Sequence, residues 1–147
     1  RGFMPEPAVR WLETPRALDM RIVDPAQLLN PQDHPSNTQL IWFRIEGPLP
    51  EDRTIHSALL AYLSDMTLLN TALIAHGRTI FDPRIRVASL DHALWFHESP
   101  RVDQWLLYAQ ESPAAAHARA LARGQIFSRA GRLIASVAQE GLIRLCD

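Results

Sequence analysis

Residues 52–77, DRTIHSALLAYLSDMTLLNTALIAHG, carry the strongest helical pattern of the chain and decide how the rest can fold around it. Apolar residues recur there at the three- and four-residue spacing of one helical face, at positions 55, 58, 59, 62, 63, 66, 69 and 73. Asp52 or Glu51 can supply the negative N-terminal end, and Gly77 is a plausible stop. We therefore predict one long helix over about 52–75, apolar over so wide an arc that it should be largely enclosed.

After Pro83 the apolar residues follow a period of two, which is typical of strands. The pattern predicts four strands, at about 85–97, 103–112, 116–128 and 132–144. Arg129-Ala130-Gly131 is a tight hairpin signal between the last two. Gly124, inside a predicted strand, indicates a bulge or a close approach of the backbone to a neighbour.

Two further strands are predicted before the helix, at 17–24 and 38–46, separated by a polar, proline-containing loop at 25–35. Residues 1–16 hold three of the eleven prolines, so we expect an extended arm or linker before a single domain at 17–147. The fold class is then α+β, because an antiparallel sheet with one apolar face curls around the single available helix. The edges and faces of such a sheet favour pairing with a second unit.

The composition excludes several classes of protein. A formal net charge of −1 argues against binding to nucleic acid, although all 15 basic residues are arginine. The single cysteine, Cys146, cannot form an internal disulfide, so a reducing, cytoplasmic location is expected. We expect no membrane span, signal peptide or peroxisomal address. The start at Arg1 indicates a processed chain or a fragment.

Three polar residues interrupt apolar faces. Asp65 lies on one helical face with Ala58, Tyr62, Leu69 and Ala72. Gln139 lies on a strand face with Leu133, Ala135, Val137 and Ile143. Ser89 lies on another strand face with Val87 and Ala93. A buried polar group is costly unless it forms hydrogen bonds. Each could be satisfied by nearby backbone, or the three could satisfy one another and hold a water molecule.

Other polar patterns are weaker. Asp91 and His92 could form an acid/base pair, but neighbours on a strand point to opposite faces, which favours a structural role. Arg119 and Arg123 share one strand face and could meet phosphate groups, or simply be solvated. The six histidines show no metal-ligand spacing, and the chain has no phosphate loop or nucleophile elbow.

The chain resembles the acyl-CoA thioesterase II family over about residues 37–144. The similarity lies in five motifs: LAYLSD at 60–65, SLDHALWFH at 89–97, DQWLLYAQES at 103–112, ARGQIF at 122–127 and VAQEGLIR at 137–144. The resemblance implies a hotdog fold, in which a curved sheet wraps a central helix. Family members usually hold two such units in one chain, and this sequence is similar to the C-terminal unit.

The resemblance also implies a site and an activity. Asp65, Ser89 and Gln139 match the family's catalytic Asp, Thr or Ser, and Gln, with Ser89 keeping the hydroxyl that relatives often carry on Thr. They would position a water molecule for hydrolysis of acyl-CoA, without cofactor or metal. Beyond what the resemblance implies, we expect Arg119, Arg123 and His92 to contact the substrate. Two alternatives stay open: a non-catalytic acyl-CoA-binding or assembly domain, and an enoyl-CoA hydratase that uses Asp65 with His92.

Overall fold

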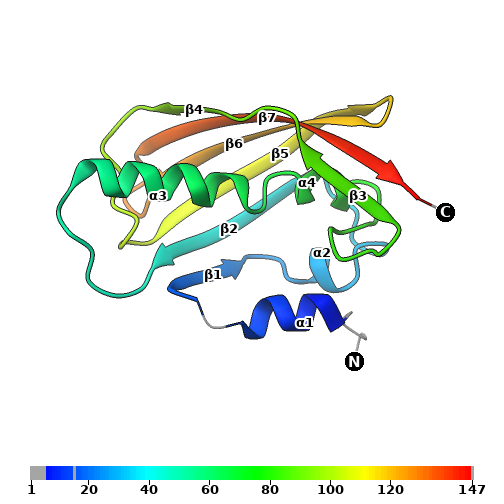
Figure 1. The fold of residues 1–147 in the computed structure, drawn as a ribbon, viewed down its shortest axis with the longest axis horizontal. Coiled ribbons are helices and arrows are strands. Elements are labelled where there is room, and N and C mark those ends of the chain that lie inside the picture. Colours follow the sequence, from blue (N-terminus) through cyan, green and yellow to red (C-terminus); the bar gives the residue numbers. More distant parts are fainter. Residues whose placement is uncertain (1–5, 15, 147) are drawn as a thin grey trace.

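A seven-stranded antiparallel sheet curls around a helix in the computed structural model, which describes residues 6–14 and 16–146 (Figure 1). The sheet order is β1-β2-β5-β6-β7-β3, and β4 also pairs with β7. The strands are β1 (Leu18–Ile22), β2 (Thr38–Ile45), β3 (Ile85–Ser89), β4 (Ala93–Phe96), β5 (Leu106–Ala116), β6 (Arg119–Ser128) and β7 (Leu133–Leu145). The predicted α+β class and the curved sheet around a central helix are confirmed.

The long strands β5, β6 and β7 form the centre of the sheet and face α3 (Arg53–Asp65) with alternate residues. In β6 every second residue from Ala120 to Ile126 is buried and the intervening residues are exposed. Gly124 belongs to the buried set, and a Cβ atom there would collide with the ring of Tyr108. The predicted close backbone approach at Gly124 is therefore confirmed, and it makes room for a fully buried tyrosine.

The continuous helix predicted over 52–75 is wrong in one respect, because α3 ends at Asp65 and a second helix, α4 (Asn70–Ile74), follows after a turn. The predicted N-terminus is confirmed, since the Asp52 side chain accepts a hydrogen bond from the Thr54 N–H at 2.7 Å. At the turn, Leu69 packs directly over Gly141 of β7, where a Cβ atom would lie 2.5 Å from the leucine side chain. Tertiary packing therefore redirects a stretch whose local pattern is helical throughout.

Three other segments differ from expectation. Residues 6–13 form a helix, α1 (Glu6–Glu13), and not an extended arm. Its Trp11 ring lies 6.1 Å from that of Phe81, so α1 packs on the domain, while residues 1–5 and 15 lie outside the described part. The loop at 25–35 contains a short helix, α2 (Ala26–Leu29). The strand predicted at 85–97 is divided into β3 and β4, because residues 90–92 leave the sheet.

The stretch 53–74 is long and apolar enough to cross a membrane by length and composition. In the structure it comprises α3, the turn and α4, and 56% of its most apolar window is buried inside the molecule. The sheet therefore covers this stretch on one side only: Ile55, Ala58 and Tyr62 of the predicted apolar face are exposed, so the prediction that the helix is largely enclosed is wrong for its outer side.

Two buried glutamines on neighbouring strands differ sharply in how they are satisfied. Gln39 of β2 lies opposite Gln110 of β5, and both are 2% exposed. Gln110 accepts a hydrogen bond from Thr71 and donates one to Thr67, whereas both amide atoms of Gln39 have no partner among the described residues. A buried amide without partners costs about 1–3 kcal/mol.

We expect Gln39→Met, which keeps the side-chain length and removes the amide, to leave the free energy of unfolding unchanged or to raise it by about 1 kcal/mol. The matched variant Gln110→Met should lower the free energy of unfolding by about 1–3 kcal/mol, because the hydroxyls of Thr67 and Thr71 lose their hydrogen-bond partner. Urea unfolding followed by circular dichroism measures both. Equal destabilisation by the two variants would show that Gln39 is satisfied in solution and would contradict this prediction.

Candidate active site

The structure brings together the three polar residues that the sequence singled out. Asp65 is the last residue of α3, Ser89 the last of β3, and Gln139 lies in the middle of β7. The Gln139 Nε2 atom donates hydrogen bonds to Asp65 Oδ1 at 2.5 Å and to Ser89 Oγ at 2.7 Å. The Ser89 hydroxyl in turn donates to Asp65 Oδ1 at 3.4 Å. The alternative in which each residue is satisfied separately by backbone is therefore wrong.

These hydrogen bonds give each group a defined role. The amide of Gln139 uses its two N–H bonds on the other two residues, and Ser89 accepts one bond and donates one. Oδ1 of Asp65 accepts from both, so the carboxylate is the common acceptor of the cluster. Its second oxygen, Oδ2, has no hydrogen-bond partner in the part of the chain that the structure describes.

The cluster lies at the boundary between core and surface. Gln139 is 1% exposed, as its apolar strand face predicted, whereas the Asp65 side chain is 52% exposed. The prediction that Asp65 lies in a core stripe with Tyr62 is wrong for this chain alone, since Tyr62 is 67% exposed. Leu69 and Ala72 are buried as predicted, because the turn after Asp65 rotates them inward. Asp65 is therefore supported from inside and open on its outer side.

One contact that sequence reasoning missed holds the end of α3 in place. The buried Tyr108 hydroxyl donates to the Ser64 carbonyl at 2.9 Å, one residue before Asp65. Burial, with a smaller contribution from the negative charge of Asp65, raises the pKa of Tyr108 far above its ordinary value, so its hydroxyl stays a donor. Ser64 lies within the family-like motif at 60–65, but its contacts depend on elements distant in sequence.

Asp91 and His92 act separately, as the sequence predicted, although the reason is a loop and not a strand. Asp91 Oδ1 accepts a hydrogen bond from the Glu140 N–H at 2.7 Å, which attaches the 90–92 loop to β7. His92 turns the other way, with Nε2 2.8 Å from Ser64 Oγ and Nδ1 3.9 Å from Asp65 Oδ1. His92 therefore borders the site.

Arg119 and Arg123 lie away from the cluster. They alternate with the buried residues of β6 and so point from the outer face of the sheet, opposite to Gln139. Arg119 pairs with Glu140 at 3.1 Å and Arg123 with Glu111 at 2.6 Å, and both side chains are more than half exposed. Within this chain they do not meet the Asp65 cluster, so their predicted substrate contact finds no support here.

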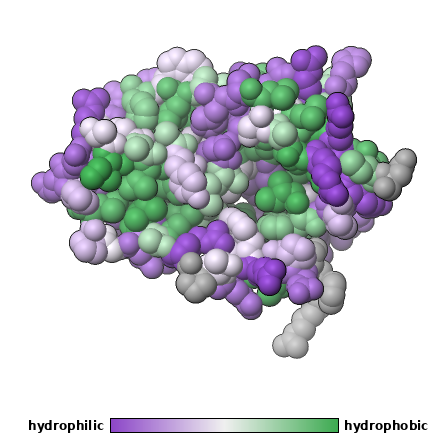
Figure 2. Space-filling view, viewed as in Figure 1, coloured by the Kyte–Doolittle hydropathy of each residue, from purple (hydrophilic) through white to green (hydrophobic). Residues whose placement is uncertain are grey.

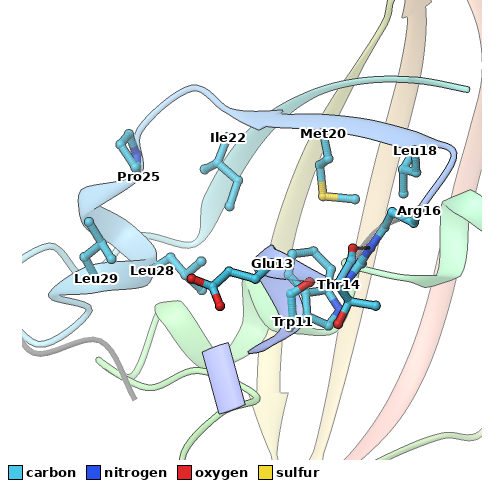
Figure 3. Close-up of a pocket in the computed structure, with 10 residues that line it drawn as sticks. All are labelled: Trp11, Glu13, Thr14, Arg16, Leu18, Met20, Ile22, Pro25, Leu28 and Leu29. Carbon is cyan, nitrogen blue, oxygen red and sulfur yellow. Dashed lines mark hydrogen bonds between the residues drawn. The ribbon is translucent and has the colours of Figure 1, made fainter. Parts of the chain in front are cut away.

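A groove of about 410 Å³ lies elsewhere, between α1, β1 and α2, and Figure 3 shows its lining. Leu18, Met20 and Ile22 of β1 form one wall, while Trp11 and Leu28 approach from the helices. None of the three clustered polar residues lines this groove. Among the described residues, no group of three or more His, Cys, Asp or Glu side chains could hold a metal ion.

Comparison with known proteins agrees with the geometry. The family model for acyl-CoA thioesterase matches residues 17–142. Acyl-CoA thioesterase 2 of Haemophilus influenzae is 44% identical over 109 residues, which cover 74% of this chain and 38% of that protein. Acyl-coenzyme A thioesterase 8 of Mus musculus is 39% identical over 132 residues, which cover 87% of this chain and 39% of the relative.

Solved structures give the same picture. The crystal structure of an acyl-CoA thioesterase II from Mycobacterium marinum is 46% identical with a TM-score of 0.75, and the match covers 88% of this chain and 49% of that one. A hot dog fold protein from Alicyclobacillus acidocaldarius, 18% identical with a TM-score of 0.67, shares the fold; the match covers 89% of this chain and 47% of that one. The chain spans 38% of the Haemophilus influenzae relative and 39% of the Mus musculus relative, as expected for one unit of a two-unit protein. It belongs to the acyl-CoA thioesterase family and has the hotdog fold.

Proposed function

We propose that this chain hydrolyses acyl-CoA thioesters, with Asp65 as the base that activates water. The observation that carries the proposal is the half-exposed carboxylate of Asp65, held on its inner side by the amide of Gln139 and the hydroxyl of Ser89. A general base must be fixed on one side and accessible on the other, and this carboxylate meets both conditions. The family to which the chain belongs supports the choice of substrate class.

In the proposed reaction a water molecule approaches the open side of Asp65 and gives up a proton to the carboxylate as its oxygen attacks the thioester carbonyl carbon. The carbon–sulfur bond then breaks, and the thiolate of CoA leaves with that proton. Gln139 and Ser89 keep the carboxylate in one orientation, which lowers the entropic cost of the attack. Ser89 already donates its proton to Asp65 and accepts from Gln139, so we assign it a positioning role and not that of nucleophile.

We further propose that a second hotdog unit covers the open side of Asp65. The outer face of α3 exposes Ile55 and Tyr62, Leu90 beside the site is 53% exposed, and hydrophobic residues gather in this region of the molecule (Figure 2). An exposed apolar patch next to a polar site is typical of an interface. For this chain alone the partner would be a second copy, and the acyl chain would lie in the apolar space between the units.

One observation favours a second candidate activity. His92 Nδ1 lies 3.9 Å from Asp65 Oδ1, so an Asp/His pair of the kind expected for enoyl-CoA hydration is within reach of one substrate. Loss of the enoyl thioester absorbance without release of thiol would identify a hydratase. Binding of acyl-CoA without either reaction would identify the non-catalytic domain. A cytoplasmic location stays a prediction, since a yeast relative is named as peroxisomal.

Replacement of Asp65 by Asn is expected to lower kcat for acyl-CoA hydrolysis by about 10²–10⁴-fold, because the amide cannot accept the proton of the water. Gln139→Ala should lower kcat by about 10²-fold or more through loss of the fixed carboxylate geometry. The activity of both variants is measured as release of the free CoA thiol, detected with a chromogenic disulfide. The matched control is Asp33→Asn, an exposed carboxylate in the loop before β2. A rate near wild type for Asp65→Asn would remove the proposed base.

For the interface, we expect the wild-type chain to sediment as a species larger than its 16.6 kDa monomer, and Tyr62→Asp to shift it toward the monomer. A charge on the outer face of α3 would be desolvated in the pair without a compensating partner. Leu121→Asp, on the outer face of the sheet, places the same charge at an exposed leucine away from α3 and should leave the assembly intact. A monomeric wild type, or the opposite order of the two variants, would contradict the assignment.

A further inference from the structure

The proposed hydrolysis does not use His92, although this side chain borders the carboxylate. We propose that His92 is an additional catalytic residue, whose Nδ1 atom holds the attacking water together with Asp65. This inference rests on the proposed function of Asp65 and extends it. It depends on three contacts: Ser64 to the backbone, Ser64 to His92, and His92 toward Asp65.

The first two contacts determine which nitrogen of His92 carries the proton. The Ser64 hydroxyl donates to the Ala61 carbonyl at 2.8 Å, which uses its only proton. His92 Nε2 lies 2.8 Å from the same Ser64 oxygen, so this ring nitrogen must be the donor of that hydrogen bond. In the neutral imidazole the lone pair is then on Nδ1. Ser64, which is fully buried, thereby selects one tautomer of His92.

The third contact has the geometry of a water site. Nδ1 of His92 is an acceptor, Oδ1 of Asp65 already accepts from Gln139 and Ser89, and at 3.9 Å the two atoms are too far apart for a direct hydrogen bond. A single water molecule at about 2.8 Å from each atom would see the two at an angle of about 90°, close to its own bond angle. It would donate one proton to Nδ1 and the other to the carboxylate of Asp65, whose Oδ2 atom has no partner among the described residues. Its oxygen lone pairs would then point away from both, toward a substrate carbonyl.

The break between β3 and β4 is what aims His92 at this position. Leu90 N–H donates to the Glu140 carbonyl at 2.9 Å and Asp91 accepts from the Glu140 N–H, so the 90–92 loop is attached to β7 at one residue. His92 follows directly and leaves the sheet toward α3. On an unbroken strand its side chain would share the face of Leu90 and Leu94. The interruption therefore has a functional consequence.

The reaction stays balanced with this addition. Asp65 takes up the proton of the water that attacks the carbonyl carbon and later gives it to the leaving thiolate, as the carbon–sulfur bond breaks. His92 Nδ1 accepts a hydrogen bond from the second proton of the water and fixes its direction. Protonation of Nδ1 would turn it into a donor toward Asp65 and displace the water. The other nearby carboxylates point elsewhere, Asp91 to the Glu140 backbone and the Glu140 side chain to Arg119.

Two substitutions of His92 separate this role from a structural one. Asn carries a polar atom at the position of Nδ1, whereas Gln can place one near the position of Nε2, which contacts Ser64. We expect His92→Gln to lower kcat for acyl-CoA hydrolysis by about 10²-fold or more, with KM within about twofold, and His92→Asn to retain at least about tenfold more activity than Gln. If contact with Ser64 is what matters, the order of the two variants reverses, and the proposal is overturned.

Ser64 supplies an independent readout, because its contact with Nε2 selects the tautomer of His92. Ser64→Ala should lower kcat for acyl-CoA hydrolysis by about tenfold, because Nδ1 then no longer keeps its lone pair toward the water. Thermal unfolding checks that the variant is folded. A folded Ser64→Ala variant with a wild-type kcat would overturn the tautomer that this role requires.

The proposed function and this inference fail in different ways. A rate near wild type for Asp65→Asn, assayed in the same series, removes the base and the water site with it. A reduced rate for Asp65→Asn combined with a wild-type rate for His92→Gln leaves the base in place and removes His92 alone.

Discussion

The hydrogen bond from the Tyr108 hydroxyl to the Ser64 carbonyl joins the C-terminal end of α3 to the centre of the sheet. It requires a tyrosine that is 1% exposed, and the ring fits only because Gly124 on the neighbouring strand has no side chain. The end of α3 carries Ser64 and Asp65, which contact His92, Ser89 and Gln139. A displacement of this helix end would therefore misplace every polar group of the site.

The turn after Asp65 serves the same arrangement. A helix that continued to residue 75 would keep Leu69 and Ala72 on the face of Asp65, and all three would share one environment. The turn buries Leu69 against Gly141 and lets Gln110 satisfy Thr67 and Thr71. Asp65 stays half exposed at the helix end. The turn thus lets the residues after Asp65 enter the core while the carboxylate of Asp65 stays accessible to solvent and substrate.

Residues far apart in sequence form the site because β7 pairs with both β3 and β6. Ser89 lies opposite Gly141, two residues from Gln139, so the serine and the glutamine meet across the β3–β7 pair. α3 then brings Asp65 over this pair from the concave side (Figure 1). Arg119 and Arg123 are close to β7 along the sheet, but their positions in the alternation place them on its opposite face. Although β6 pairs with β7, the alternation of side chains along β6 keeps these arginines on the face of the sheet away from the site.

Local sequence by itself determined the long strands and the start of the central helix, and it singled out Asp65, Ser89 and Gln139 as polar exceptions, because period-two and period-3.6 patterns report on burial. Of these three exceptions only Gln139 is buried as its pattern predicted, whereas the side chains of Asp65 and Ser89 are exposed. The family resemblance joined those exceptions into one candidate site. Only the tertiary structure decided where the helix breaks, why 90–92 leave the sheet and how His92 is oriented. These features depend on Gly141 beneath Leu69, Tyr108 beneath Ser64 and Glu140 beside Asp91. Each is a contact between distant elements, and such contacts override local preference without leaving a periodic pattern in the sequence.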